Sequence, residues 1–469
     1  MEINVILFWT LFPAIVSFAA FAGYLYGKGR EKKKEKSEEA PTGNAPELSF
    51  ELNKKYRHDE SLGRGKQFIQ KYEMVTVMLA DIEGFSKITD NVDPEVLVNE
   101  LNDIFYYFDS HIDHYQVEKI KTMGDAYMCA GGILYKNHTN PMDVVLLALE
   151  VQNHQKKLSE KNPKVWNMRI GIHTGPVIAG MLGQKKLSFD IWGHTVNMAA
   201  RLEADCESGK INISETTYEK IKDYFYCEYH GIAPRTDEPS YYVKGLKPEY
   251  IQTDSDGKTV ANNAFAVKMQ LLRLTDLEEY VVSMMTNITS NMYFHNVKHI
   301  MDVCGQVELL ALSENIKDED ILLLKTAALL HDIGYAITYG DDISDVSENI
   351  AREFLPSFQY KPHQIDRICD LMKKANYDSI PHGIVEEVMH DANHMYFGRT
   401  DYIDLVKNLF RELEEHNIQI NRAEWYKNQI NRMANHKFYT QTAEKLVEVP
   451  AEQQISNLKN EALKTTLLF

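Results

Sequence analysis

The stretch VEKIKTMGDAYMCAGG, residues 117–132, alternates apolar and polar residues on both sides of a glycine. This pattern predicts a β-hairpin with Gly124 at its tip. Lys121 and Asp125 flank the tip, so one cation and one anion lie close together on the same hairpin. A lone aspartate in a turn most often only stabilises the turn. The hairpin alone therefore does not assign a function to this pair.

Strand-like and helix-like segments alternate on both sides of the hairpin. Residues 74–82 (MVTVMLADI) are rich in β-formers, and residues 93–115 carry apolar side chains at helical spacing. After the hairpin, residues 140–158 predict a helix, and MRIGIHTGPVIAGML (168–182) predicts a pair of strands around a Gly-Pro turn. This order predicts an α/β domain with two crossover helices on one sheet.

The chain also divides into further regions. We expect the α/β domain to span residues 72–250, followed by a polar linker at 251–263. Residues 264–447 have a helical pattern almost throughout and predict an all-helical domain. Residues 448–469 form a C-terminal tail, for which we expect either a further helix or a frayed end.

The N-terminal residues are unusually apolar. Residues 4–27 contain no charged side chain, and about twenty apolar residues are enough to cross a bilayer as a helix. The basic run KGREKKKEK follows directly, and such runs stay on the cytoplasmic side of a membrane. We therefore expect a single-pass anchor at 1–27 in the inner (cytoplasmic) membrane, a charged juxtamembrane linker at 28–71, and the folded domains that follow in the cytoplasm.

Composition excludes some classes of protein. The 469 residues are too many for one ordinary domain, and 44% hydrophobic with 25% charged residues is typical of a folded chain. A formal net charge of −17 without a basic face argues against nucleic-acid binding. The five cysteines form no CxxC pair, which argues against a disulfide framework or a cysteine-based zinc site.

The end of the strand at residues 74–82 carries the first group of candidate site residues. Asp81 closes the strand, and Gly84, Phe85 and Ser86 open the next helix. A carboxylate beside backbone amides at a helix start suits a metal–polyphosphate complex. Asp125 supplies a second carboxylate. The alternative is a helix cap for Asp81 and a simple turn residue for Asp125.

Four segments in the same order decide between these alternatives. LADIEGFSKIT, EKIKTMGDAYM, RIGIHTGPVIAG and FDIWGHTVNMAARLE together resemble the class III nucleotidyl cyclase catalytic domain, over residues 73–247. The resemblance implies a ferredoxin-like sheet with helices on one face. It also implies two Mg²⁺ or Mn²⁺ ions bound by Asp81 and Asp125, with the carbonyl of Ile82 assisting.

The resemblance assigns base recognition to Lys121 and Asp190. Adenylyl cyclases carry Lys and Asp at these two positions, whereas guanylyl cyclases carry Glu and Cys. Lysine can donate to a ring nitrogen of adenine, and aspartate can accept from its exocyclic amine. This implies ATP as the substrate and adenylate cyclase as the activity.

Further roles follow from the same resemblance. Asn197 and Arg201 lie four residues apart, on one helix face, and would orient the ribose and stabilise charge on the transferred phosphate. The usual VKGKG loop, whose lysine binds the terminal phosphates, is replaced by GIAPRTDEPSYYVKG. Arg235 falls nearest to that lysine, and Lys244 is a weaker candidate. In this family, one subunit supplies the metal-binding aspartates of an active site and the other supplies the base-reading and transition-state residues. Because this chain has all of these residues, the resemblance implies a homodimer.

The helical domain carries a second group of candidate residues. His295 and His299 share one helix face, and the doublets His331-Asp332 and His390-Asp391 follow. Imidazoles and carboxylates on several helices suit divalent metal ions. The pattern resembles the HD superfamily of metal-dependent phosphohydrolases, which implies an unidentified divalent metal on the residues His299, His331, Asp332 and Asp391. By resemblance to cyclic-nucleotide phosphodiesterases, His295 would protonate the leaving oxygen.

Departures from the HD pattern leave the role of this domain open. The doublet continues as HDIGY rather than HDxxH, and the last motif reads Asp391-Ala-Asn393, so either end of it could face the metal. The leading hypothesis is a membrane-anchored adenylate cyclase whose HD domain is a phosphohydrolase or a regulator. The alternatives are a bifunctional enzyme that also hydrolyses a cyclic nucleotide, or an HD domain that only senses a ligand.

Overall fold

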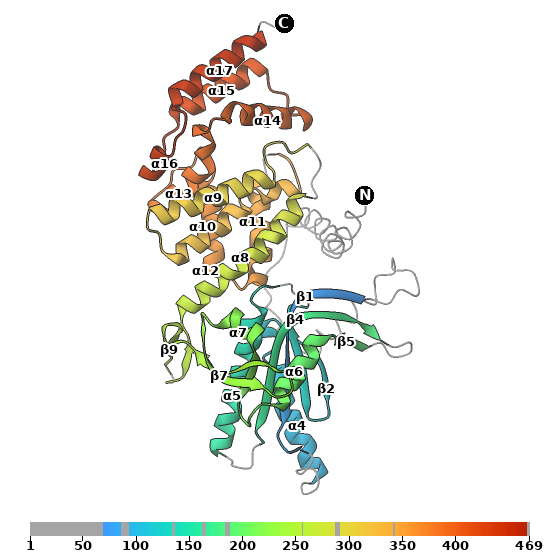
Figure 1. The fold of residues 1–469 in the computed structure, drawn as a ribbon. Coiled ribbons are helices and arrows are strands. Elements are labelled where there is room, and N and C mark those ends of the chain that lie inside the picture. Colours follow the sequence, from blue (N-terminus) through green and yellow to red (C-terminus); the bar gives the residue numbers. More distant parts are fainter. Residues whose placement is uncertain are drawn as a thin grey trace, which may run out of the picture. The chain divides into compact units, whose positions relative to one another are not determined.

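The computed structural model describes residues 69–85, 93–133, 137–161, 166–182, 188–255, 257–286, 291–340 and 343–466 (Figure 1). The described chain divides between Arg273 and Leu274 into two compact units. The expected anchor at 1–27, most of the expected linker at 28–71, and Ser86 lie outside the described residues. Within the described ranges, no helix has the length and apolarity that a membrane span requires.

The first unit contains an eight-stranded mixed sheet with the order β2-β3-β1-β4-β6-β8-β7, and β5 also pairs with β4. Among the described strands of this sheet, only β4 and β6 pair in parallel. The strands are β1 (Ile69–Ile82), β2 (Val117–Met123), β3 (Ala126–Gly131), β4 (Met168–Leu182), β5 (Ser188–Trp192), β6 (Ile211–Ser214), β7 (Phe225–Ala233) and β8 (Glu238–Leu246). The expected hairpin at 117–132 is therefore present as β2 and β3.

The expected strand pair at 168–182 is instead one long strand, β4. It pairs with β1 along nearly its whole length, and β5 and β6 pair with its other edge. Gly175 and Pro176 lie where the β1–β4 register shifts, between Tyr72 and Val75 of β1. Because a proline cannot donate to a sheet, strands accommodate it at bulges of this kind. The Gly-Pro dipeptide therefore bends the strand without reversing it.

Helices cover both faces of the sheet, which corrects the expectation that they lie on one face. Met78, Ala80 and Ile82 of β1 belong to a core cluster shared with helices on one side. Val75, Val77 and Leu79 point to the other side, where α6 packs. The helices of this unit are α4 (Pro94–Asp109), α5 (Asn140–Lys161), α6 (His194–Ala204) and α7 (Glu215–Ile221), with short 3₁₀ helices η1 (Asp113–Tyr115) and η2 (Pro248–Tyr250) (Figure 1).

Helix α6 approaches β4 closely at Gly171. A Cβ atom at this position would lie 2.2 Å from the Glu203 amide nitrogen and 2.3 Å from the Ala199 carbonyl oxygen. Only glycine permits such an approach of two backbones. This contact fixes the height of α6 above the sheet, and with it the position of the side chains that α6 presents.

The expected linker at 251–263 forms a short hairpin of β9 (Ile251–Thr253) and β10 (Thr259–Ala261). Helix α8 (Asn263–Thr286) follows, and its Phe265 and Met269 belong to the core of the first unit. Arg273 ends this contact with an ion pair to Asp143 of α5 at 2.8 Å, and both side chains are buried.

The second unit is helical, as expected from the sequence pattern. It contains the C-terminal part of α8, then α9 (Val297–Ser313), α10 (Asp318–Leu330), α11 (Ile343–Phe354), α12 (Pro362–Lys374), α13 (Ile384–His394), α14 (Tyr402–Glu415), α15 (Arg422–Asn435), α16 (Gln441–Lys445) and α17 (Ala451–Thr466). Its 3₁₀ helices are η3 (Ile333–Ala336), η4 (Leu355–Phe358) and η5 (Met395–Gly398). The tail at 448–469 thus contains a helix, and Leu458 of α17 is fully buried in the core.

Candidate functional site

The first candidate site lies at the end of β1. The register of β1 and β4 places Arg169 directly opposite Asp81, and the Arg169 guanidinium donates to the Asp81 carboxylate with Nη2···Oδ2 at 2.8 Å. The same nitrogen lies 3.0 Å from Oε1 of Glu203, near the end of α6. Sequence reasoning missed Arg169 and Glu203, because cross-strand register and helix packing bring them to Asp81.

The hairpin of β2 and β3 brings Asp125 to the same place. Gly124 adopts φ +65° in its turn, a conformation that favours glycine. Burial raises the pKa of Asp125, and the adjacent charge of Asp81 raises it further, while a backbone hydrogen bond and Arg169 oppose the rise. Like charges held side by side are the usual arrangement of a divalent cation site. Asp81 and Asp125 therefore fit the metal ligands expected from the sequence.

Glu203 adds a third carboxyl group to this site. Burial raises its pKa to about 7; the charges of Arg169 and Arg235 oppose this rise, and those of Asp81 and Asp125 add to it. Arg235 itself lies in the β7–β8 turn and forms an ion pair with Asp205, with Nε···Oδ1 at 3.3 Å. The group therefore contains three carboxyl groups, with Arg169 between Asp81 and Glu203 and with Arg235 close enough to act on Glu203.

The turn after β1 holds the remaining residues of this region. Ile82 is buried under the sheet, and Gly84 adopts φ +70° with open space around it. Phe85 packs edge-on against Trp166, with ring centroids 5.9 Å apart. Gly84 thus lies in the turn after β1, and the helix expected to open here would continue into residues 86–92, which lie outside the described residues. Lys244, the weaker phosphate candidate, pairs instead with Glu228 across β7 and β8 at 2.7 Å.

The expected base-reading pair is also assembled. Lys121 Nζ donates to Asp190 Oδ2 at 2.6 Å, from β2 to β5. The second Asp190 oxygen, Oδ1, accepts from the amide of Ile191 at 2.9 Å. The side chain of Lys121 remains 38% exposed and that of Asp190 17% exposed, so both groups can be reached from solvent.

Helix α6 presents Asn197 and Arg201 to solvent. Both residues are exposed, whereas Met198 and Leu202, which each follow them by one position, are buried. The spacing of four residues therefore places them on one accessible face, as expected.

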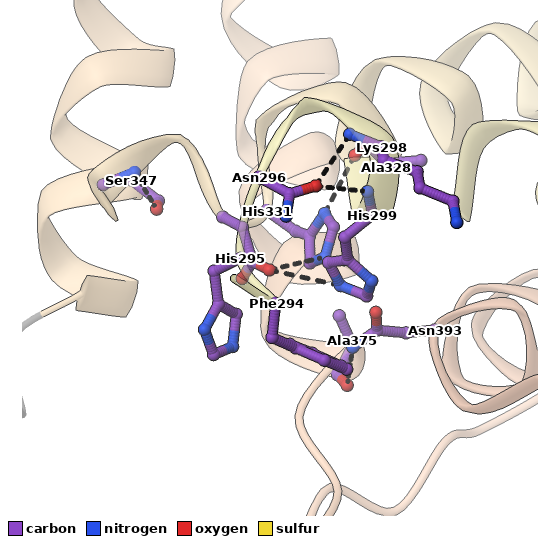
Figure 2. Close-up of polar contacts among 12 residues, drawn as sticks. Phe294, His295, Asn296, Lys298, His299, Ala328, His331, Ser347, Ala375 and Asn393 are labelled. Carbon is purple, nitrogen blue, oxygen red and sulfur yellow. Dashed lines mark hydrogen bonds and ion pairs between the residues drawn. The ribbon is translucent and has the colours of Figure 1, made fainter. Parts of the chain in front are cut away.

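The second unit contains a compact group of metal-binding side chains. His299, His331 and Asp332 place one ligand atom each within 4.8 Å of one another, and the described residues contain no other group of three such side chains. Asp332 Oδ2 lies 3.3 Å from His299 Nε2 and 3.2 Å from His331 Nε2. Figure 2 shows the two imidazoles facing the same point.

Local structure orients both histidines. Asn296 caps α9 by accepting from the amides of Lys298 and His299, so His299 lies in the first turn. His331 Nδ1 lies 2.8 Å from the Ala328 carbonyl. This contact makes Nδ1 the donor and leaves Nε2 as a lone-pair ligand, as is usual for metal-bound histidines. His331 Nε2 is buried without an aligned hydrogen bond, which fits a bound metal ion.

The electrostatics of the group agree with a cation site. Burial opposes the charged form of Asp332, yet the neighbouring histidines hold its pKa well below the usual range. Burial lowers the pKa of His299. Burial also opposes protonation of His331, but the charge of Asp332 outweighs it and raises the pKa. The carboxylate is therefore ionised, as a metal ligand must be.

The structure does not bring Asp391 to this group. Its carboxylate is fully buried and accepts from the amides of Tyr439 and Thr440 and from the Thr440 hydroxyl, at 2.7–3.0 Å. Asn393 lies there instead: Nδ2 donates to Ala375 at 2.9 Å, while Oδ1 is buried without a partner. Figure 2 places Asn393 beside His299.

His295 forms a separate pair next to the metal-binding group. Its Nδ1 lies 2.5 Å from Oε1 of Glu412 on α14, and the second oxygen of Glu412 accepts from the amides of Phe294 and His295. Burial opposes ionisation of Glu412, but His295 lowers its pKa. Glu412 was not foreseen, because more than a hundred residues separate it from His295.

A small cavity of about 80 Å³ adjoins the group. Its lining includes His299 of the metal-binding group, together with Asn393, Phe294, Tyr396, Lys298 and Arg399. Arg399 is paired with Asp302, which also lines the cavity, and with Asp401. A small ligand could therefore reach His299 from a partly aromatic surface of mixed charge.

Comparisons with known proteins identify both units. Residues 68–249 match the family described as the adenylate and guanylate cyclase catalytic domain, and residues 296–429 match the HD domain. The first unit is 33% identical over 181 residues to adenylate cyclase type 9 of Gallus gallus (38% of this chain, 14% of the relative). It is 33% identical over 161 residues to an adenylate cyclase of Mycobacterium tuberculosis (34% and 36%).

A guanylyl cyclase is matched as well. The chain is 35% identical over 188 residues to guanylyl cyclase C of Homo sapiens, which is 38% of this chain and 17% of the relative. The chain thus spans between 14% and 36% of the length of these three relatives.

Solved structures include the guanylate cyclase domain of RhGC from Catenaria anguillulae in complex with GTP, at 30% identity and TM-score 0.36 over 38% of this chain and all of that one. The adenylyl cyclase CyaB of P. aeruginosa matches at 26% identity and TM-score 0.36, over 39% and 98%. The two family matches show that the chain carries a class III adenylate and guanylate cyclase catalytic domain at residues 68–249, followed by an HD domain at residues 296–429.

Proposed function

We propose that the protein is an adenylate cyclase that converts ATP to 3′,5′-cyclic AMP and pyrophosphate. The ion pair between Lys121 and Asp190 carries this proposal. It holds a donor and an acceptor together at an accessible edge of the sheet, which suits a ring nitrogen and the exocyclic amine of adenine. Guanine presents the reverse pattern at the same edge, so the pair favours ATP over GTP.

Each candidate residue has its own proposed role in the reaction. Asp81 and Asp125 would hold two Mg²⁺ or Mn²⁺ ions, which lower the pKa of an attacking hydroxyl and neutralise phosphate charge when bound. Arg169 and Arg235 lie close to the carboxyl groups and would contact the triphosphate. Asn197 would orient the ribose, and Arg201 would stabilise the charge that develops on the transferred phosphate.

We also propose that the active form is a homodimer. Asn197 and Arg201 face solvent within one chain, whereas groups that stabilise a transition state act in a water-excluded site. A second copy would supply that enclosure and create two equivalent sites. A monomer with full activity in size-exclusion chromatography would contradict this arrangement.

The HD domain has two proposed roles. The geometry of His299, His331 and Asp332, with a cavity beside them, supports a divalent metal that activates water for phosphoester hydrolysis. His295, oriented by Glu412, would supply the proton to the leaving oxygen. The other role is a metal-bound regulator or ligand sensor without turnover.

One time course tests the cyclase and separates the two HD roles. The purified full-length chain receives ATP or GTP with Mn²⁺, and nucleotides are separated by chromatography. We expect cyclic AMP from ATP, abolished by Asp81→Ala and retained in Asp223→Ala, an exposed carboxylate outside both sites. Cyclic AMP that later decays to AMP, unless His331→Ala is present, identifies a phosphodiesterase; stable cyclic AMP favours the regulatory role. Cyclic GMP as the main product would contradict ATP specificity.

Membrane anchoring is a further proposal. The uncharged run at 4–27 followed by basic residues supports a single-pass anchor in the cytoplasmic membrane. Recovery of the full-length chain in the soluble fraction after cell lysis would contradict it.

A further inference from the structure

The guanidinium of Arg169 is a cation that lies among the proposed metal ligands of the cyclase site. Arg169 Nη2 lies 2.8 Å from Asp81 and 3.0 Å from Glu203, so one guanidinium nitrogen bridges two carboxyl groups. Asp125 lies beside Asp81 in the same group. One arginine thus partly neutralises three acidic side chains that otherwise repel one another.

The two contacts of Arg169 are not equivalent. The contact with Asp81 is an aligned hydrogen bond. Glu203 Oε1 lies at ion-pair distance from the same nitrogen, but the oxygen is buried without an aligned hydrogen bond. Arg169 Nε is likewise buried and unpaired. Arginine therefore has spare donors, and Glu203 has a spare acceptor, next to each other.

A divalent ion held by Asp81 and Asp125 would add positive charge beside the Arg169 guanidinium and would repel it. Glu203 is the acceptor that already lies 3.0 Å from the same guanidinium nitrogen. It is held on α6, whose backbone rests on Gly171, so its place in the site is fixed before any metal arrives.

We propose that Arg169 is a placeholder cation, which occupies Asp81 until a divalent metal binds and then transfers to an ion pair with Glu203. This inference rests on the proposed metal-dependent cyclase. Arg169 and Glu203 act as positioning residues in this step. Arg169 keeps the carboxylates together without metal, and Glu203 retains the released guanidinium where a triphosphate would meet it. Metal binding therefore competes with Arg169 and is assisted by Glu203.

Mn²⁺ binding to the full-length chain, without nucleotide, tests the proposal. Electron paramagnetic resonance measures the concentration of free Mn²⁺ during a titration. Because the HD group can also bind metal, the part of the Mn²⁺ binding that is lost in Asp125→Ala is assigned to the cyclase site. Arg169→Ala should tighten this component by about tenfold, the effect of removing one competing ion pair. Glu203→Gln should weaken it by about threefold or more, since Arg169 then has only Asp81.

The double variant Arg169→Ala with Glu203→Gln distinguishes the transfer of Arg169 to Glu203 from a direct electrostatic effect of Glu203 on the metal. If Glu203 acts through Arg169, Glu203→Gln has no further effect in the Arg169→Ala background. An equal weakening in both backgrounds would overturn the proposal, because Glu203 would then act directly on the metal. Lys222→Ala removes one positive charge at an exposed ion pair elsewhere and should leave the affinity unchanged.

Two further outcomes keep the result decisive. If Arg169→Ala does not fold by circular dichroism, Arg169→Gln removes the charge while keeping polar contacts, with the same expectation. If the wild type shows no component that depends on Asp125, the proposed metal site fails and this inference fails with it. Binding that depends on Asp125 but is unchanged in the Arg169 variants would overturn the placeholder role alone.

Discussion

Lys121 and Asp190 are separated by 69 positions in the chain, and their side chains meet at 2.6 Å. Replacing them with the guanylyl pair, Lys121→Glu with Asp190→Cys, should reverse the donor and acceptor pattern at the base. We expect the ratio of kcat/KM for ATP to that for GTP to fall by at least about tenfold, because a wrong polar edge leaves buried groups unpaired. Initial rates with both nucleotides measure it, and the same preference in the double variant would refute base reading by this pair.

Asp391 and Asn393 illustrate a choice that sequence alone left open. Asp391→Ala removes the acceptor of two amides and a hydroxyl at Tyr439 and Thr440. We expect a loss of about 2–4 kcal/mol in the free energy of unfolding, since the amide and hydroxyl of Thr440 stay buried and lose their acceptor. Urea titration in the presence of a chelator measures this loss without a contribution from metal.

Asn393→Ala should affect metal retention rather than stability. The free energy of unfolding with chelator should change little, whereas retention of metal by the HD domain should fall, because the unpaired Oδ1 beside His331 is lost. Metal content after dialysis measures retention. If Asp391→Ala lost metal without losing stability, the assignment of the two residues would have to be exchanged.

At the scale of elements, the contact between α6 and β4 is the most sensitive point of the cyclase unit. Gly171→Ala places a Cβ atom 2.2 Å from the Glu203 amide nitrogen, so α6 must move away from the sheet. We expect activity to fall by about a hundredfold or more, because small displacements of catalytic groups have effects of this size. The melting temperature should fall as well.

Gly305→Ala is the matched control for this element-scale prediction. Gly305 lies inside α9 with nothing within 4 Å of a Cβ position. Alanine is the better helix former, so this variant should be neutral or slightly stabilising, with full cyclase activity. An active, stable Gly171→Ala variant would show that α6 tolerates displacement and that its height above the sheet does not limit catalysis.

At the scale of the whole molecule, α8 begins in one unit and ends in the other. Arg273 and Asp143, 5% and 3% exposed, form a buried ion pair that joins α8 to α5. Arg273→Ala should lower the free energy of unfolding of the first unit by about 3–5 kcal/mol, because the buried Asp143 loses its ion pair with Arg273 and keeps only weaker contacts such as the hydrogen bond from Thr139. Denaturant titration followed by cyclase activity measures it. Arg273→Leu with Asp143→Leu should recover most of the loss; failure to recover would show that the pair has a role other than charge compensation.

Local patterns predicted much of the fold and part of the site. Hydrophobic periodicity indicated the α/β and helical units, and the resemblance of four motifs to the class III cyclase domain assigned roles to Asp81, Asp125, Lys121 and Asp190. Where the prediction from local sequence was wrong, pairing between strands that are distant in the sequence was the cause. The Gly-Pro dipeptide at 175–176 predicts a turn, but partner strands on both edges hold it inside β4.

The sequence by itself determined which chemical groups this protein has and in which kind of element each one lies, because those properties depend on neighbours a few residues away. Only the tertiary structure decided that Arg169 and Glu203 meet Asp81, that Glu412 orients His295, and that Asn393 rather than Asp391 faces the HD group. These contacts depend on strand register and helix packing between distant segments, and no local pattern contains that information.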